Sequence, residues 1–250
     1  MKKLTFKILT KFFFLTFVVA LAFSACGDSQ NNDISPAPDY LTQYASAIED
    51  AKIAETDEIC SSLVKISLDN DSLQRTTFYG DSYVLTFTWT QYNSYCGHEN
   101  ETMALVWGKT WVSIPYEMKQ FIADNHIDTS QKTLRYEQLL GLPYNSGKKW
   151  FVEMWVKPAD LFRPSPDSEI CDCKAEIDFS NDTPPSYQYV QWFVENKISS
   201  YYGQNKFPWT RLGYTYDWGN NNSEIGLSEF VIEKNAVVII KSVAATLDYR

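Results

Sequence analysis

The segment Phe207–Trp218 combines the side chains with which proteins hold polar ligands. It carries aromatic rings, a guanidinium and a carboxylate, and the asparagine-rich loop 220–222 follows it. Aromatic faces stack on sugar rings or on cations, whereas Arg, Asp and Asn supply directional hydrogen bonds. The pattern therefore predicts a ligand-binding face whose members are Trp209, Arg211, Tyr214, Tyr216, Asp217 and Trp218. The alternative is a core strand whose rings pack inward and whose Arg211 and Asp217 pair at one edge.

Cysteines form a second group with chemical potential. The four that follow residue 39 are Cys60, Cys96, Cys171 and Cys173. An even number in an exported chain favours disulfides. Because a bond across the single residue between Cys171 and Cys173 would be strained, each is expected to pair with a more distant cysteine. Two alternatives stay open, namely free thiols and a metal site formed by Cys96, His98, Cys171 and Cys173. Zinc ligands usually stand two to four residues apart within a pair, which speaks against the metal site.

The lack of common catalytic motifs favours a binding protein over an enzyme. The chain lacks Gly-x-Ser-x-Gly, the phosphate-binding glycine loops and His-Glu-x-x-His. The acidic stretch 167–182 offers carboxylates for calcium or for acid–base chemistry, but it also fits a solvated face of an acidic protein. Its members are Asp167, Glu169, Asp172, Glu176, Asp178 and Asp182. We therefore expect no catalysis and no cofactor.

One enzymatic alternative concerns three residues near the C-terminus. Arg211, Tyr214 and Glu229 partly resemble the Arg, the aromatic residue and the Glu of ADP-ribosyltransferases. This resemblance implies transfer chemistry that uses NAD, which an extracytoplasmic protein does not readily obtain. Two further candidate classes are a hydrolase of the cell envelope and a purely structural envelope protein.

Periodic apolar residues predict the elements that must position these groups. Spacings of three and four predict helices at 39–54 with Asp39 as cap, from Pro115 with Ser113 as cap, at 133–140, and after Pro184-Pro185 to about Tyr202. The last of these should turn Tyr189, Val190, Phe193 and Ile198 inward. Alternation predicts strands at 83–92, 103–112 and 150–156, with Gly108 as a bulge or turn. The segments 229–232 and 236–243 are expected to form a hairpin.

Helices and strands are interleaved without a regular β–α–β rhythm and without an internal repeat. This order predicts an α+β fold with a mainly antiparallel sheet and several short helices. Because no linker-like stretch divides residues 39–250, we expect them to form one domain, which is long enough to bury a substantial core.

The first 25 residues have the features of an export signal. Four lysines and no acid precede an apolar run from Phe12 to Ala25, which is short for a membrane-spanning helix. The sequence Phe23-Ser24-Ala25-Cys26 resembles the lipobox of bacterial lipoproteins, although Phe23 stands where leucine is usual. The resemblance implies cleavage before Cys26, lipidation of Cys26, and a flexible tether over residues 26–38.

Charge narrows the possible partners. The chain has a formal net charge of -9 and a sequence pI near 4.8, which excludes a nucleic-acid binder. Loss of the four leader lysines would take the charge to -13, so acyl chains rather than a basic patch would hold the protein to the membrane. The resemblance to lipoproteins further implies that Gly27, as the residue after a lipidated Cys26, favours the outer membrane, with the domain facing the periplasm or the cell surface. We expect a lipid-anchored, non-catalytic module that binds a glycan or a peptide.

Overall fold

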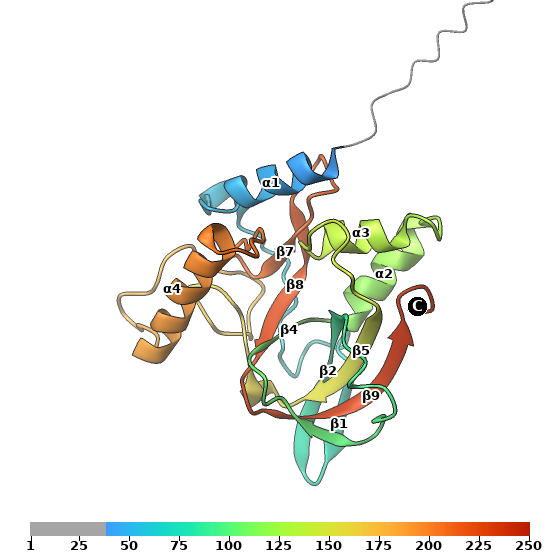
Figure 1. Cartoon of the computed structure of the whole chain (residues 1–250). Coiled ribbons are helices and arrows are strands. Elements are labelled where there is room, and N and C mark those ends of the chain that lie inside the picture. Colours follow the sequence, from blue (N-terminus) through green and yellow to red (C-terminus); the bar gives the residue numbers. More distant parts are fainter. Residues whose placement is uncertain (1–38) are drawn as a thin grey trace, which may run out of the picture. The chain divides into compact units, whose positions relative to one another are not determined.

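Alternating apolar residues build a mainly antiparallel sheet, which the computed structural model shows within residues 39–250 (Figure 1). The leader, Cys26 and the tether lie outside these described residues. The strands are β1 (Arg75–Phe78), β2 (Asp81–Thr90), β3 (Thr102–Ala104), β4 (Thr110–Ser113), β5 (Trp150–Val156), β6 (Leu161–Phe162), β7 (Tyr214–Tyr216), β8 (Ile225–Ile232) and β9 (Val237–Ala245). Their order is β3-β9-β5-β2-β4-β8-β6, with β1 paired to β2 and β7 to β8. The predicted α+β class is confirmed.

Four helices accompany the sheet in the described part of the chain. They are α1 (Tyr40–Asp50), α2 (Pro115–Asn125), α3 (Lys132–Leu139) and α4 (Tyr187–Tyr202). The 3-10 turn η1 (Thr56–Glu58) lies between α1 and β1, and η2 (Pro158–Asp160) lies between β5 and β6. Asp39 caps α1 as predicted, because its carboxylate accepts a hydrogen bond of 3.1 Å from the Thr42 amide. No helix within residues 39–250 is long and apolar enough to cross a membrane.

Three large hydrophobic clusters divide the interior. The first fills one face of the sheet, with Val84, Val112 and Phe230 among its members. The second lies between the opposite face and helices α2 and α3, and the third joins α1 and α4 to the segment 207–218. Figure 1 shows β7 and β8 running between α4 on one side and α2 and α3 on the other. Residues 39–250 thus form one compact unit.

The single strand expected over 103–112 is wrong. The segment contains two strands, β3 and β4, separated by a turn in which Gly108 has φ +154°. β3 pairs with β9, whereas β4 pairs with β8 and β2, so the two halves of the segment lie in different parts of the sheet. Glycine permits the backbone conformation that redirects the chain between them.

The hairpin expected at 229–243 is also wrong. β8 and β9 are consecutive strands, but β8 pairs with β4, β6 and β7, whereas β9 pairs with β5 and β3. The intervening turn is bonded to other segments, because the Glu233 amide donates to Asp160 O and the Asn235 amide donates to Leu105 O, each at 2.9 Å. These long-range bonds separate the two strands.

Two details of the predicted helices need correction. Ser113 is the last residue of β4, and Ile114 takes the N-cap position of α2 without a side-chain cap. Ile198 was expected on the inner face of α4, yet it is 56% exposed. Phe193 is buried as predicted, and Ser200 and Tyr201 complete the inner face, because the Tyr201 hydroxyl bonds to Trp209 O and draws that side of the helix inward.

Candidate functional site

A gap between two central strands creates the main cavity. β2 and β4 pair at Phe87 and Ser113, and the pairing goes no further. Beyond this point Thr88–Thr90 and Thr110–Val112 line a cavity of about 820 Å³, although continued register would have joined them. We call it the interstrand cavity. Its volume lies in the range of small-molecule sites.

The register shows which backbone groups face this gap. The Leu85 amide donates to Gln74 O on the side of β1, and backbone groups in a strand return to the same side every second residue. The N–H and C=O of Trp89 are therefore directed toward β4. On β8 the Glu229 amide bonds to Gly213 O, away from β4, so Ser113 and Trp111 direct their backbone groups toward β2. Each side of the cavity thus has a short open strand edge.

Aromatic packing explains why the strands part. The Trp89 ring stacks on Phe151 with 5.3 Å between centroids and belongs to the cluster under α2 and α3. The Trp111 ring packs edge-on against Trp209 at 5.9 Å and against Phe207 at 6.2 Å, in the cluster of α1 and α4. Since the two indoles belong to different clusters, the strand segments that carry them are drawn apart.

The segment Leu140–Pro143, which follows α3, forms one wall of the cavity. Trp218 Nε1 donates to Leu142 O at 2.9 Å, and the buried carboxylate of Glu137 accepts the amides of Asn145 and Ser146 at 3.0 and 2.6 Å. Gly141 has φ +63°, and a Cβ there would stand 3.3 Å from Tyr216 O. This wall is fixed by hydrogen bonds at both ends.

The carboxyl group of Glu229 is the most unusual group that lines the cavity. Glu229 stands beside Ser113 across the β4–β8 pair, and Ser113 in turn stands beside Phe87, so the three side chains share one face of the sheet. Its carboxyl has no hydrogen bond to another described residue. Burial raises the pKa of Glu229 to about 8, so the group is mainly uncharged at neutral pH.

Other polar groups line the same cavity. Burial lowers the pKa of Lys148, whereas Lys109 pairs with Glu233 and lies over the ring of Trp192 at 5.4 Å. Lys206, Tyr92 and Tyr95 complete the titratable side chains of the lining. The Thr110 hydroxyl is buried and has no partner among the described residues. The cavity is thus aromatic and aliphatic, with a few polar groups that lack internal partners.

The segment Phe207–Trp218 takes a different role from the one predicted. Trp209 is 2% exposed and Tyr214 1%, so the expected exposed face of rings is wrong, and the alternative of inward-packed rings is correct. Hydrogen bonds occupy the polar atoms as well: Trp209 Nε1 to Pro164 O, Tyr214 Oη to Glu58 O, Tyr216 Oη to Asp50, and Trp218 Nε1 to Leu142 O. The segment joins α1, α3 and α4.

Arg211 and Asp217 are not paired with each other. The Arg211 guanidinium donates to the Tyr201 hydroxyl at 2.9 Å and to the carbonyls of Ala51 and Lys52 at 3.2 and 3.0 Å. It therefore fixes the end of α1 against α4. The Asp217 carboxylate is bound by Arg135, and carbonyl oxygens satisfy the Arg211 guanidinium instead.

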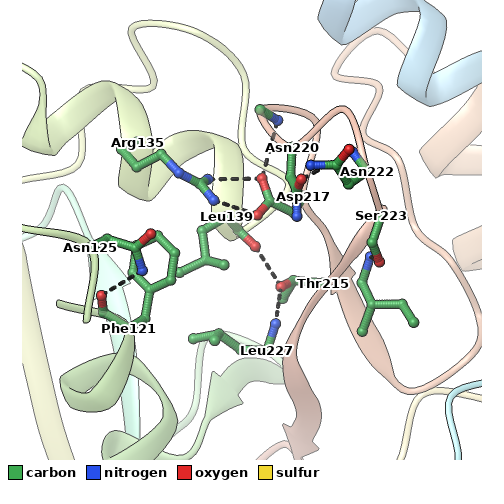
Figure 2. A network of polar contacts seen from close by, with 12 residues as sticks. Phe121, Asn125, Arg135, Leu139, Thr215, Asp217, Asn220, Asn222, Ser223 and Leu227 are labelled. Atoms are coloured by element: carbon green, nitrogen blue, oxygen red, sulfur yellow. Dashed lines mark hydrogen bonds and ion pairs between the residues drawn. The ribbon is translucent and has the colours of Figure 1, made fainter. Parts of the chain in front are cut away.

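Asp217 lies in a second, polar cleft (Figure 2). Arg135 makes two bonds to its carboxylate, of 2.8 and 2.6 Å, above a cleft of about 580 Å³ lined by Phe121, Asn125 and Asn220–Asn222. The Thr215 hydroxyl donates to Leu139 O at 2.6 Å and accepts from the Leu227 amide at 2.9 Å. Leu139 and Leu227 line the polar cleft, whereas Thr215 lines the interstrand cavity. The hydrogen bonds of the Thr215 hydroxyl therefore lie in the wall between the two.

The four cysteines are free thiols in the structure, with Cys60 buried and Cys96 exposed. The expected disulfides are therefore not formed in it. The proposed ligand set of Cys96, His98, Cys171 and Cys173 is not assembled either, and His98 Nδ1 lies 2.7 Å from Glu101. Within residues 39–250, the one cluster of three metal-ligating side chains is Asp167, Glu169 and Asp172. It carries no further sign of a bound ion.

The ADP-ribosyltransferase-like triad does not converge. Arg211 and Tyr214 direct their polar atoms to the α1 region, and neither lines the interstrand cavity where Glu229 lies.

Comparison of the chain with protein-family models, with curated proteins and with solved structures finds no match. Sequence reasoning missed Trp89, Trp111 and Lys148 as cavity residues. The one available signal was Glu229, an acid within the apolar strand Leu227–Ile232.

Proposed function

We propose that this protein is a lipid-anchored, extracytoplasmic binding module whose ligand, a peptide or a glycan, occupies the interstrand cavity. The observation that carries the proposal is the uncharged, unpartnered carboxyl of Glu229 in a cavity lined mainly by rings and aliphatic side chains. Ligand sites typically combine such a lining with a few placed polar groups. The Thr110 hydroxyl in the same lining is buried without a partner, and because such a group is costly to leave unbonded, a ligand that bonds to it gains specificity.

The lining favours a peptide over a glycan. The half-buried Trp111, Phe207 and Leu142 present apolar surface, which suits an apolar side chain better than a ring of hydroxyl groups. The amide and carboxylate side chains that suit a glycan gather in the separate polar cleft, at Asn125, Asp217 and 220–222, whereas the interstrand cavity has Asn205 and Glu229.

Anchoring by lipid is supported by the lysine-rich start, the apolar run and the lipobox at Cys26. Metabolic labelling with an alkyne fatty acid should mark the wild-type chain and fail to mark the Cys26→Ser variant. Labelling that persists in the variant would exclude this anchor.

Ligand binding is tested by filling the cavity. Leu140 lines it, whereas Leu41 on α1 is 70% exposed, so Leu140→Trp and Leu41→Trp make a matched pair. The probes are a random hexapeptide mixture and a panel of N-acetylglucosamine oligomers. The wild type and Leu41→Trp should retain members of one class, and Leu140→Trp should lose at least tenfold in affinity. Equal binding by both variants, or no retained probe, would refute the cavity as the site.

A further inference from the structure

The geometry of the gap between β2 and β4 narrows the class of ligand further. This inference rests on the proposed function. We propose that the ligand is an extended peptide segment that enters the interstrand cavity and forms backbone hydrogen bonds with the open edges of β2 and β4, at Trp89 and Trp111. The segment would lie between these two strands as an added strand in the sheet.

The first support is the state of the two strand edges. On their outer sides both strands are paired along this stretch, since β2 keeps its register with β5 up to Thr90 and β4 keeps its register with β8 from Thr110 to Ser113. The inner sides carry backbone N–H and C=O groups that no strand pairs. Such groups inside a sheet normally have partners, and strand addition is a known way to supply them. Each edge opens the N–H and C=O of one residue, Trp89 or Trp111, and an extended peptide backbone carries the donor and the acceptor that match both.

The second support is the chemistry above each side of the gap. Side chains of an inserted strand alternate between two faces. Those on the face of Phe87 and Ser113 would meet the Trp111 indole and the Glu229 carboxyl, which, when uncharged, donates one hydrogen bond and accepts another. This favours an apolar side chain or an uncharged amide. Lys148 and Lys206, which also line the cavity, disfavour a basic residue in the segment.

The length of the gap sets the length of the segment. From the last paired residue, Phe87, to Thr90 the strand advances by about 10 Å at ~3.3 Å per residue. Tyr92 and Trp107, which are 63% and 54% exposed, line the cavity as well. Three or four ligand residues therefore fit inside, and the remainder of the peptide would extend past these two rings.

The experiment uses the full chain in detergent and a random hexapeptide mixture, from which retained peptides are identified by mass spectrometry and resynthesised. Hydrogen exchange is then measured with and without the best peptide. The amides of Trp89 and Trp111 should exchange at least tenfold more slowly in the complex, whereas the Leu85 amide, already bonded to Gln74 O, should not change. Peptide analogues N-methylated at successive residues should lose at least tenfold in affinity at the central positions.

The outcomes separate the two proposals. If peptides bind and Leu140→Trp abolishes binding, but exchange at Trp89 and Trp111 is unchanged and N-methylation has no effect, strand addition is wrong and the binding function stands. Retention of N-acetylglucosamine oligomers without peptides has the same meaning. If neither class binds, the proposed function itself fails.

Discussion

Replacement of Glu229 by glutamine should flatten the pH dependence of stability between pH 6 and pH 9. Burial places the pKa of the Glu229 carboxyl at about 8 in the folded chain, against an ordinary value of 4.5. Between these two values the folded chain retains a proton that the unfolded chain has released. Stability therefore falls as the pH rises through this window, because deprotonation favours the unfolded state.

The size of the effect follows from the two pKa values of Glu229. The Glu229 carboxyl contributes its full share to the free energy of unfolding below its pKa in the unfolded chain. This contribution is lost as the pH rises through its pKa in the folded chain. As the pH rises from 6 to 9, the free energy of unfolding of the wild type therefore falls by about 3 kcal/mol. Glutamine has nearly the same shape and no titration, so the difference between Glu229→Gln and wild type should grow by about this amount over the same range.

Urea unfolding followed by tryptophan fluorescence at pH 6, 7, 8 and 9 measures this difference. Burial also raises the pKa of Glu117 to about 7, but Glu117 is present in both proteins and its contribution cancels. The matched control is Glu99→Gln, since Glu99 is an exposed glutamate with no ion pair among the described residues. A difference that stays constant from pH 6 to pH 9 would show that Glu229 is not desolvated, and the description of the cavity would fail.

Three further predictions concern the segment 207–218 and its neighbours. Arg135→Met should destabilise the fold by about 3 kcal/mol in urea unfolding, because the Asp217 side chain, 3% exposed, loses its partner. The double variant with Asp217→Asn should recover most of this loss, and a double variant no better than the single would contradict the ion-pair argument. Gly213→Ala should cost about 1–3 kcal/mol in thermal unfolding, because φ is +75° and the new Cβ would lie 2.8 Å from Arg163 Cδ. Gly97→Ala, with φ +80° and open space, should cost less, and equal losses would refute the packing argument. Arg211→Met should speed proteolysis near α1, since the Ala51 and Lys52 carbonyls lose their donor; cleavage at the wild-type rate would count against that role.

Local sequence patterns predicted the helices and strands that are fixed by neighbouring residues, through a cap or through alternation of apolar and polar side chains. Asp39 marks the start of α1, and the alternation of Leu85, Phe87 and Trp89 marks β2, because capping and burial act directly on neighbouring residues. The pairing of β8 and β9 was not predictable in this way. It depends on bonds from Glu233 and Asn235 to residues more than 70 positions earlier, which leave no periodic trace in the turn itself.

The site was less predictable than the fold. Trp209, Tyr214 and Trp218 have the composition of a binding face, yet composition does not distinguish a ring that contacts a ligand from one that packs against a second ring. Their hydrogen-bond partners are carbonyls of the η1 turn, the 140–143 segment and the 163–165 region, which the sequence does not bring together. The cavity arises from a place where two strands fail to pair, and single-strand patterns do not contain that information.

Two separate clusters of aromatic rings explain the central gap in the sheet. Rings around α1 and α4 form one cluster, and rings around α2 and α3 form another. The Trp111 ring packs in the first cluster and the Trp89 ring in the second, so each indole is packed although the two strands between them do not pair. Backbone pairing of the two strands would gain a few hydrogen bonds, each worth about 1 kcal/mol, but would pull a buried indole out of its cluster at a larger cost. The gap is therefore the lower-energy arrangement of the chain alone, and a ligand that pairs with both edges can enter it without opening either cluster.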